Sequence, residues 1–267
     1  MVCIERPAPI LGLADERESG FFIVPHRHDS AQLIYATEGV MTVETDDGVW
    51  VVPPERAVWV PAFVTHSIRM TGAVRMRTLY VDTSIAAIEE RHCCVVQVSQ
   101  LLRACIARFF DIPEAWPDDG PDARVVSVLL DEIRAAPTAP LHLPTPSDPR
   151  ALRVAEAFRA RPSDRRSIGE WARFAGASER TLERMFLGEL GMTLGRWQRQ
   201  ARLLRALEVL ASGSSVTEAA LEVGFETPSA FIAMFRRAMG TTPARYFRAE
   251  PNRPSTAPLG RAAAVSA

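Results

Sequence analysis

Residues 167–178 read SIGEWARFAGAS and residues 215–227 read SVTEAALEVGFET, and these two stretches decide the fold of the C-terminal part of the chain. Each begins with Ser-x-x-Glu, the capping box that starts an α-helix, and continues with apolar residues. Each then reaches a glycine and a residue that can cap a second helix. The glycines are Gly176 and Gly224, and the second caps are Ser178 and Thr227. The pattern predicts one unit twice: a short helix, a tight turn and a second helix.

The duplication continues beyond the turn, where matching residues lie 49 positions apart. They are Leu182 with Phe231, Met185 with Met234, Phe186 with Phe235, Gly191 with Gly240 and Trp197 with Tyr246. Between the copies, residues 194–210 have the apolar spacing of one long helix that would hold the two units at a fixed separation. In a helix-turn-helix, the second helix enters the major groove of DNA. A helical bundle without a nucleic-acid role is the alternative, but it leaves the duplication unexplained.

Charge divides the chain in the same way. Residues 1–149 carry a net charge of −9 and residues 150–249 carry +7, so the second part suits a polyanion such as double-stranded DNA. No run of about 18 apolar residues and no leader segment are evident, which argues against membrane and secreted proteins. The four cysteines form no Cys-x-x-Cys pair, as is usual in the reducing cytoplasm, where we expect the protein.

The remaining patterns predict an α+β protein with two domains. Residues 21–83 alternate short apolar runs with turn signals, which is typical of a small antiparallel β-barrel, and the predicted barrel domain is 1–83. Residues 84–136 carry two apolar helical stripes, and we expect this segment to form the contact of a homodimer. Four prolines make 137–149 an extended linker, and 150–249 is the tandem helix-turn-helix domain. The tail, 250–267, is rich in Pro, Ala and Ser and is expected to be disordered.

Three C-terminal segments resemble the signature of the AraC/XylS family of transcription regulators: Glu189–Thr193, Val223–Glu226 and Phe235–Phe247. The resemblance covers about residues 150–248. It implies that the two units reach successive major-groove faces of one DNA site, and that RNA polymerase is a partner if the protein activates transcription. Family members that sense an effector carry an N-terminal cupin-like barrel and a helical dimerisation segment, which is the order that this sequence predicts.

The predicted DNA contacts differ between the two units. Arginine can bond guanine and glutamate can accept from cytosine, so Arg180 and Glu183 are the expected base readers. The first set is Ser178, Glu179, Arg180, Glu183 and Arg184; the second set is Thr227, Ser229, Ala233, Arg236 and Arg237. Ala233 stands where related proteins often carry a base-reading side chain, so Arg236 and Arg237 are expected to anchor phosphates. An ordinary solvated helix face is the alternative for 180–184.

Three of the five histidines form a pattern: His26-Arg27-His28, then Gln32 four residues further on, then the distant His66. The pattern is similar to the metal motif of cupins, in which glutamate usually stands where this chain has Gln32. Alternate residues of a strand share a face, so these side chains can form one site. We predict that His26, His28, Gln32 and His66 bind the effector or a divalent metal, and that Tyr35 and Trp59 line the same cavity.

Three interpretations of the histidines stay open at this point: hydrogen-bonded residues of a polar pocket, a bound divalent metal, and the metal centre of a cupin enzyme. The leading function is a transcription regulator controlled by a small-molecule effector in the barrel, with no required cofactor and no catalytic activity. The alternatives are a metal-dependent cupin enzyme fused to a DNA-binding domain and a regulator that binds DNA without a ligand. No general acid or base is apparent beside the histidines, which favours the regulators over the enzyme.

Overall fold

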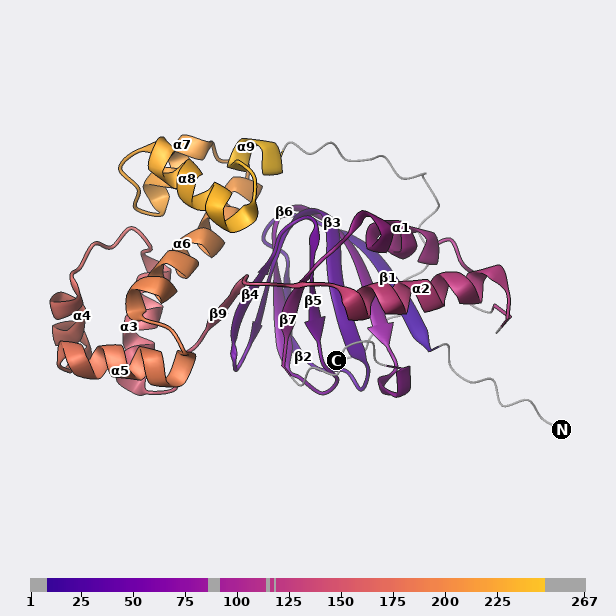
Figure 1. Ribbon diagram of the computed structural model, residues 1–267, viewed down its shortest axis with the longest axis horizontal. Coiled ribbons are helices and arrows are strands. Elements are labelled where there is room, and N and C mark those ends of the chain that lie inside the picture. Colours follow the sequence, from indigo (N-terminus) through magenta and orange to yellow (C-terminus); the bar gives the residue numbers. More distant parts are fainter. Residues whose placement is uncertain (1–8, 86–91, 114–115, 118, 248–267) are drawn as a thin grey trace. The chain divides into compact units, whose positions relative to one another are not determined.

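The computed structural model describes residues 9–85, 92–113, 116–117 and 119–247 (Figure 1). Within these residues the chain forms two compact units. The first contains the residues up to 43 together with 52–140, and the second contains 44–51 and the residues from 141 onward. The predicted α+β, two-domain fold class is confirmed. The tail for which disorder is predicted lies outside the described residues.

The first unit is built on antiparallel strands. They are β1 (Ile10–Arg17), β2 (Phe22–His26), β3 (Ala31–Thr45), β5 (Arg56–Val60), β6 (His66–Val81), β7 (Cys94–Gln97) and β8 (Thr138–Ala139), with a 3-10 helix η1 (Thr83–Ile85) after β6. Their order in the sheet is β1-β6-β3-β5-β7-β8, and β2 pairs with β6 next to the segment of β6 that pairs with β1. Because β7 lies within the sheet, the segment 84–136 is not wholly helical, as its stripes had suggested.

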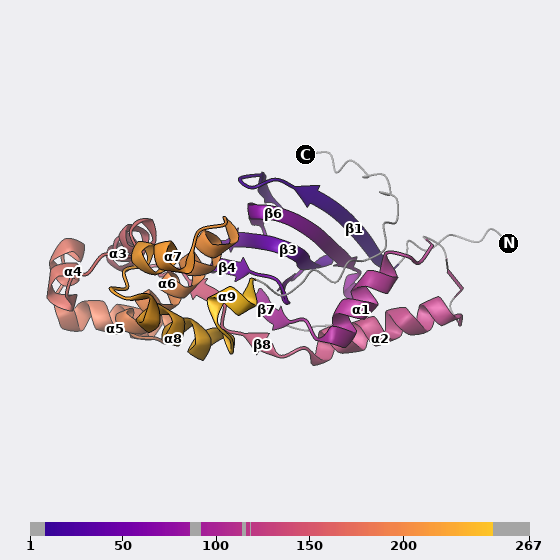
Figure 2. The same cartoon turned by 90° about the horizontal axis from the view of Figure 1, so that it is seen from above.

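The sheet has an outer face that is covered by helices α1 (Gln100–Phe109) and α2 (Pro121–Ala135), which lie together on one side of the strands in Figure 2. Leu33 and Trp59 are paired between β3 and β5, and both belong to the buried apolar cluster that includes these helices. Successive residues of a strand point to opposite faces. Gln32, one residue before Leu33, therefore points to the inner face of the sheet.

Helices α1 and α2 bury one stripe of side chains and expose another. Leu129 and Ile133 are fully buried in the cluster beneath the helices, whereas Leu101 and Val128 are 52% and 41% exposed. The stripe containing Leu129 therefore packs on the chain's own sheet and is not free to contact a second copy. If the helices form a dimer contact as predicted, the contact involves the exposed stripe.

The second unit contains seven helices among its described residues. They are α3 (Pro149–Ala160), α4 (Ile168–Ala175), α5 (Glu179–Leu190), α6 (Leu194–Ala211), α7 (Val216–Glu222), α8 (Pro228–Met239) and α9 (Pro243–Tyr246). Both predicted capping boxes are confirmed, at Ser167 with Glu170 and at Ser215 with Glu218. Gly176 ends α4 with a φ of 69°, a left-handed conformation that favours glycine.

Helix α6 joins the two helix-turn-helix units and supplies core residues to both ends. Near its start, the Trp197 ring lies 6.2 Å from Phe158 and 5.8 Å from Phe186 between ring centroids. The second helix-turn-helix unit has its own aromatic core, in which the Phe235 ring lies 6.0 Å from that of Phe231 and 5.9 Å from that of Tyr246, between ring centroids. None of the helices among the described residues is long and apolar enough to cross a membrane.

Residues 137–149 do not form the extended spacer that their prolines predict. Strand β8 pairs with β7, and β9 (His142–Pro144) pairs with β4 (Gly48–Val52) in the register Val49 to Leu143. Helix α6 also holds β9, because Trp197 Nε1 donates to the carbonyl of Pro144 at 2.9 Å and Gln200 Nε2 donates to that of His142 at 2.7 Å. Proline stops helices but is tolerated in short edge strands, which explains the difference.

Candidate nucleic-acid interface and sensor site

The first recognition helix, α5, presents three charged side chains together. Arg180, Glu183 and Arg184 are all exposed, and none of them forms an ion pair within the described part of the chain. Residues three and four apart share one helix face, so the three side chains form a single charged surface. Two of the residues predicted to contact DNA also have local roles. Ser178 caps the helix by accepting a hydrogen bond from the Thr181 backbone at 3.2 Å, and the Glu179 carboxylate lies against Gly169 of α4.

The second recognition helix, α8, presents a much less polar surface. Thr227 caps it by accepting a hydrogen bond from the Ala230 backbone at 3.3 Å, and Pro228 occupies its first turn. Ser229 and Ala233 are exposed at its start, and its only charges, Arg236 and Arg237, lie in the last turn. Both arginines are exposed and form no ion pair with any described residue. The helix thus offers small side chains at one end and two available cations at the other.

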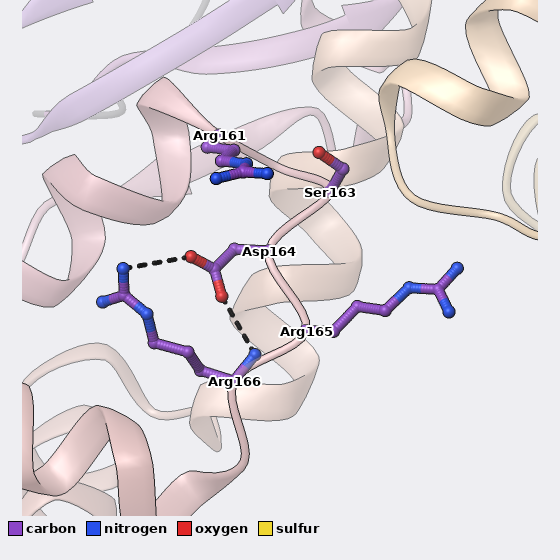
Figure 3. Close-up of a pocket in the computed structure, with 5 residues that line it drawn as sticks. All are labelled: Arg161, Ser163, Asp164, Arg165 and Arg166. Carbon is purple, nitrogen blue, oxygen red and sulfur yellow. Dashed lines mark hydrogen bonds and ion pairs between the residues drawn. The ribbon is translucent and has the colours of Figure 1, made fainter.

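A shallow pocket lies in the loop between α3 and α4, at the start of the first helix-turn-helix unit (Figure 3). Its lining is Arg161, Ser163, Asp164, Arg165 and Arg166. The Arg166 guanidinium pairs with the Asp164 carboxylate at 3.3 Å and lies over the Trp171 ring at 4.4 Å. The pocket is thus a charged turn in which acidic partners engage two of the three arginines, and no sequence motif points to it.

The same loop also contacts the second helix-turn-helix unit. Arg165 forms an ion pair with Glu226 at 2.7 Å, in the turn between α7 and α8. Gly224, with a φ of 85°, lies so close to Ser163 that an added Cβ would be 2.8 Å from its Cα. Together with α6, these contacts fix the two recognition helices in one frame.

The N-terminal compact unit brings His26, His28 and His66 into one cluster, as the sequence predicts. Their ring centroids are 4.4 to 5.5 Å apart, and one ligand atom from each residue lies within 4.8 Å of the others. His26 ends β2 and pairs with His66 at the start of β6, and His28 follows two residues later. Chain segments 40 residues apart therefore meet at this point of the sheet.

Backbone carbonyls fix the state of two of these imidazoles. His26 Nδ1 lies 2.8 Å from the carbonyl of Val24, and His66 Nδ1 lies 3.0 Å from that of Val64. A carbonyl oxygen can only accept, so in each ring Nδ1 is the donor and Nε2 is the nitrogen that can face a ligand. Burial lowers the pKa of His66 to about 4, and burial followed by the charge of His26 lowers the pKa of His28. His66 is therefore neutral at neutral pH.

Two further residues, Gln32 and Tyr80, face the same inner side of the sheet as the cluster. Gln32 is buried, faces the inner side of the sheet, and its Oε1 has no hydrogen-bond partner among the described residues. The Tyr80 ring lies 4.9 Å from that of His28, edge to face, and burial raises the pKa of its hydroxyl. Tyr80 was not predicted. Its position between Leu79 and Val81, which face the outer cluster, is the sequence signal that turns it inward.

Tyr35 and Trp59 do not line the site with the histidines, contrary to the prediction. Both are 1% exposed and belong to the apolar cluster under α1 and α2 on the outer face of the sheet. The Tyr35 hydroxyl interacts with Arg103 of α1, on the same side. Tyr35 follows Gln32 by three residues on one strand, so the two side chains lie on opposite faces of the sheet, which the prediction of a shared cavity did not take into account.

The cluster meets the requirements for a metal ion. Nε2 of both His28 and His66 is buried and has no hydrogen-bond partner among the described residues. Buried polar atoms are normally satisfied, so two unpartnered ring nitrogens in one cluster point to a missing partner. Neutral imidazoles whose other nitrogen donates to a carbonyl are typical metal ligands. The three histidines therefore fit a borderline transition-metal ion, for which imidazole is a preferred ligand.

Comparison with known proteins relates both units to regulators. Residues 10–131 match the AraC-like ligand binding domain family, and residues 171–249 match the Helix-turn-helix domain family. The HTH-type transcriptional regulator NimR of Escherichia coli (strain K12) is 33% identical over 221 residues, which are 83% of this chain and 81% of NimR.

Two further proteins are similar to a smaller share of this chain. The HTH-type transcriptional regulator RipA of Corynebacterium glutamicum is 37% identical over 110 residues, 41% of this chain and 32% of RipA. The DNA-binding domain of AdpA, solved in complex with a target DNA, is 34% identical and covers 39% of this chain and 93% of its own, with a TM-score of 0.36. The similarity to NimR, by contrast, extends over most of the chain.

Proposed function

The chain belongs to the AraC/XylS family of DNA-binding transcription regulators, and on this premise we propose that it is a sequence-specific regulator controlled by a small-molecule effector bound in its N-terminal barrel. One observation carries the proposal: two recognition helices with available arginines share a chain with a ligand-binding domain. The relatives are named transcriptional regulators, so we propose no catalytic activity. The cytoplasm is the proposed location, since that is where a bacterial regulator meets DNA.

The two recognition helices divide the work of DNA binding. Arg180 and Glu183 of α5 have the donor and acceptor groups that read guanine and cytosine in the major groove. Arg236 and Arg237 of α8 supply the positive charge that binds phosphates without regard to sequence. Ala233 leaves the start of α8 suited to apolar contact with thymine methyl groups. In this proposal α5 selects the site and α8 strengthens binding to it.

Control by an effector requires that the effector bind one arrangement of the protein better than another. We propose that the arrangement is set in a homodimer through the exposed stripe of α1 and α2. Leu101→Arg places a charge on that stripe and should give a folded monomer in sedimentation velocity. Glu18→Arg, in the exposed turn between β1 and β2 and away from both helices, is the control. A wild-type protein that sediments as a monomer at all concentrations contradicts the dimer.

Genome-wide footprinting with and without candidate effectors tests the whole proposal. We expect protection of a small number of promoter sites, at positions that change when the correct effector is present. If the protected sites lie upstream of promoters that become active, RNA polymerase is the further partner. Uniform binding along the genome, or binding that no small molecule alters, would contradict sequence-specific, effector-controlled regulation.

A further inference from the structure

The histidine cluster has the composition of a metal site but an unusual charge. Its three ligand atoms come from His26, His28 and His66, and the group contains no carboxylate. Asp29, which is exposed, acts on the pKa of His28, but its effect is smaller than those of burial and of His26. Gln32 faces the same inner side of the sheet with a buried oxygen that lacks a partner among the described residues, and it too is neutral.

Two properties follow from these donors. Imidazole nitrogens favour zinc, nickel, cobalt, copper or iron over magnesium and calcium, which prefer oxygen ligands. Three protein ligands also leave at least one coordination position open, as in zinc sites that take an exchangeable ligand. The spacing of up to 4.8 Å exceeds twice a zinc–nitrogen bond of about 2.0–2.1 Å, so binding must draw the rings together.

The charge of the ion then sets the chemistry of its remaining ligand. Neutral protein donors leave a divalent cation uncompensated in a largely buried place, where electrostatic attraction is stronger than in water. An anionic oxygen donor satisfies both the open position and the charge. A neutral ligand satisfies only the first of these.

We propose that His26, His28 and His66 bind one divalent transition-metal ion, and that the effector is a small anion that completes the coordination of this ion. The second part rests on the proposed effector-controlled function. Tyr80, whose ring lies 4.9 Å from that of His28, would then lie beside the bound anion, where a phenol can donate a hydrogen bond to it.

Cobalt(II) is a suitable probe because its visible absorption bands report coordination. Full-length protein freed of metal with a chelator is titrated with Co²⁺, and one ion per chain is expected, displaced by Zn²⁺. His28→Ala should weaken binding by more than about a hundredfold, since even the loss of an outer partner costs about 10–100-fold. His92→Ala is the matched control, because His92 is exposed and outside the cluster.

Folding is checked separately, because His66 is fully buried and its replacement can destabilise the protein. His26→Ala replaces a half-buried ring and should also lose Co²⁺ while keeping the thermal melting curve of the metal-free wild type. The metal site is overturned if Co²⁺ fails to bind stoichiometrically to the wild type. It is equally overturned if folded His26→Ala and His28→Ala bind Co²⁺ as the wild type does.

The anion is tested with azide, a small anionic ligand, and with urea as a neutral control. Azide should shift the cobalt bands of the wild type and urea should not; unchanged bands with azide overturn the anionic effector. A gel-shift assay on a footprinted site separates the two levels of the proposal. If Co²⁺ does not bind but DNA binding still responds to a small molecule, the metal inference fails while the proposed function stands.

Discussion

The two helix-turn-helix units share their backbone chemistry but not their surfaces. Each has a Ser-x-x-Glu capping box, a glycine with positive φ in the turn, and a second helix capped by a hydroxyl side chain. At the start of the second helix, α5 exposes Arg180, Glu183 and Arg184, whereas α8 exposes Ser229 and Ala233. The residues that cap and turn the helices thus differ from the residues that face outward. The same backbone arrangement can therefore carry a charged surface on α5, the proposed base reader, and a less polar surface on α8, the proposed phosphate anchor.

The units also differ in how firmly their turns are held. Nothing lies within 4 Å of a Cβ added at Gly176, whereas one added at Gly224 would lie 2.8 Å from the Ser163 backbone. Glu226, two residues after Gly224, is tied to Arg165. The turn before α8 is therefore packed against the α3–α4 loop, whereas the turn before α5 has no such neighbour at Gly176.

The largest expected effect comes from removing the core of one unit at a time. Phe186 and Phe235 are matched, fully buried rings, and replacing either by alanine should cost about 3–5 kcal/mol of stability. Phe186→Ala should abolish the preference for operator over random DNA, whereas Phe235→Ala should weaken binding to both. Thermal melting and competition gel shifts measure the two effects. An equal loss of preference in both variants would break the comparison.

Alanine at the two turn glycines separates the open turn from the braced one. Gly176→Ala should cost about 1–2 kcal/mol, the penalty of a left-handed conformation with a side chain. Gly224→Ala carries the same penalty and a clash with Ser163, which adds roughly 1–3 kcal/mol. Urea unfolding of the full chain measures the difference. Equal losses would show that the loop does not brace the second unit.

Arg180→Ala tests the reader directly. Loss of a bidentate arginine–guanine contact should weaken operator binding by about 1–3 kcal/mol and relax base preference at one position. Selection of bound sequences from a random pool reveals that position. Arg153→Ala is the matched control, because Arg153 is exposed on α3, outside both helix-turn-helix units. The assignment is wrong if operator and random DNA lose affinity equally.

Arg237→Ala should have the smallest effect, and it should be blind to sequence. Loss of one phosphate contact weakens binding to all DNA and reduces the slope of log affinity against log salt by about one. Titrations at several salt concentrations, on operator and random DNA, give both slopes. A change in base preference with an unchanged slope would make α8 a reader as well.

The helical unit was predictable because its signals are local. Capping boxes, turn glycines and Pro149 after the cap Asp148 act within a few residues, and the structure has each of them in the expected place. Strand pairing is not local. Nothing in residues 137–149 indicates that His142 will pair with Trp50, which lies far away in the sequence. Strand β1 was also missed, because its second half, Ala14–Arg17, is charged and polar rather than apolar.

The sensor cluster was predictable in part for the same reason. The spacing of His26 and His28 places both near the end of one strand, and the structure joins them to His66. Which face of a strand is covered by helices depends on the packing of α1 and α2, and this decides that Tyr35 and Trp59 face away from the cluster. The same packing buries Leu129, although its helical stripe is correctly identified.

Strand β9 determines where the protein can be cut. The proline-rich segment invites a cut just before Pro149, but a fragment that starts there leaves the Trp197 indole and the Gln200 amide without their carbonyl acceptors. A fragment that starts at residue 137 keeps both acceptors. Recombination that exchanges sensors between related regulators meets the same boundary, because Gly48, Val49 and Trp50 of β4 pair with β9 and must be inherited together with it.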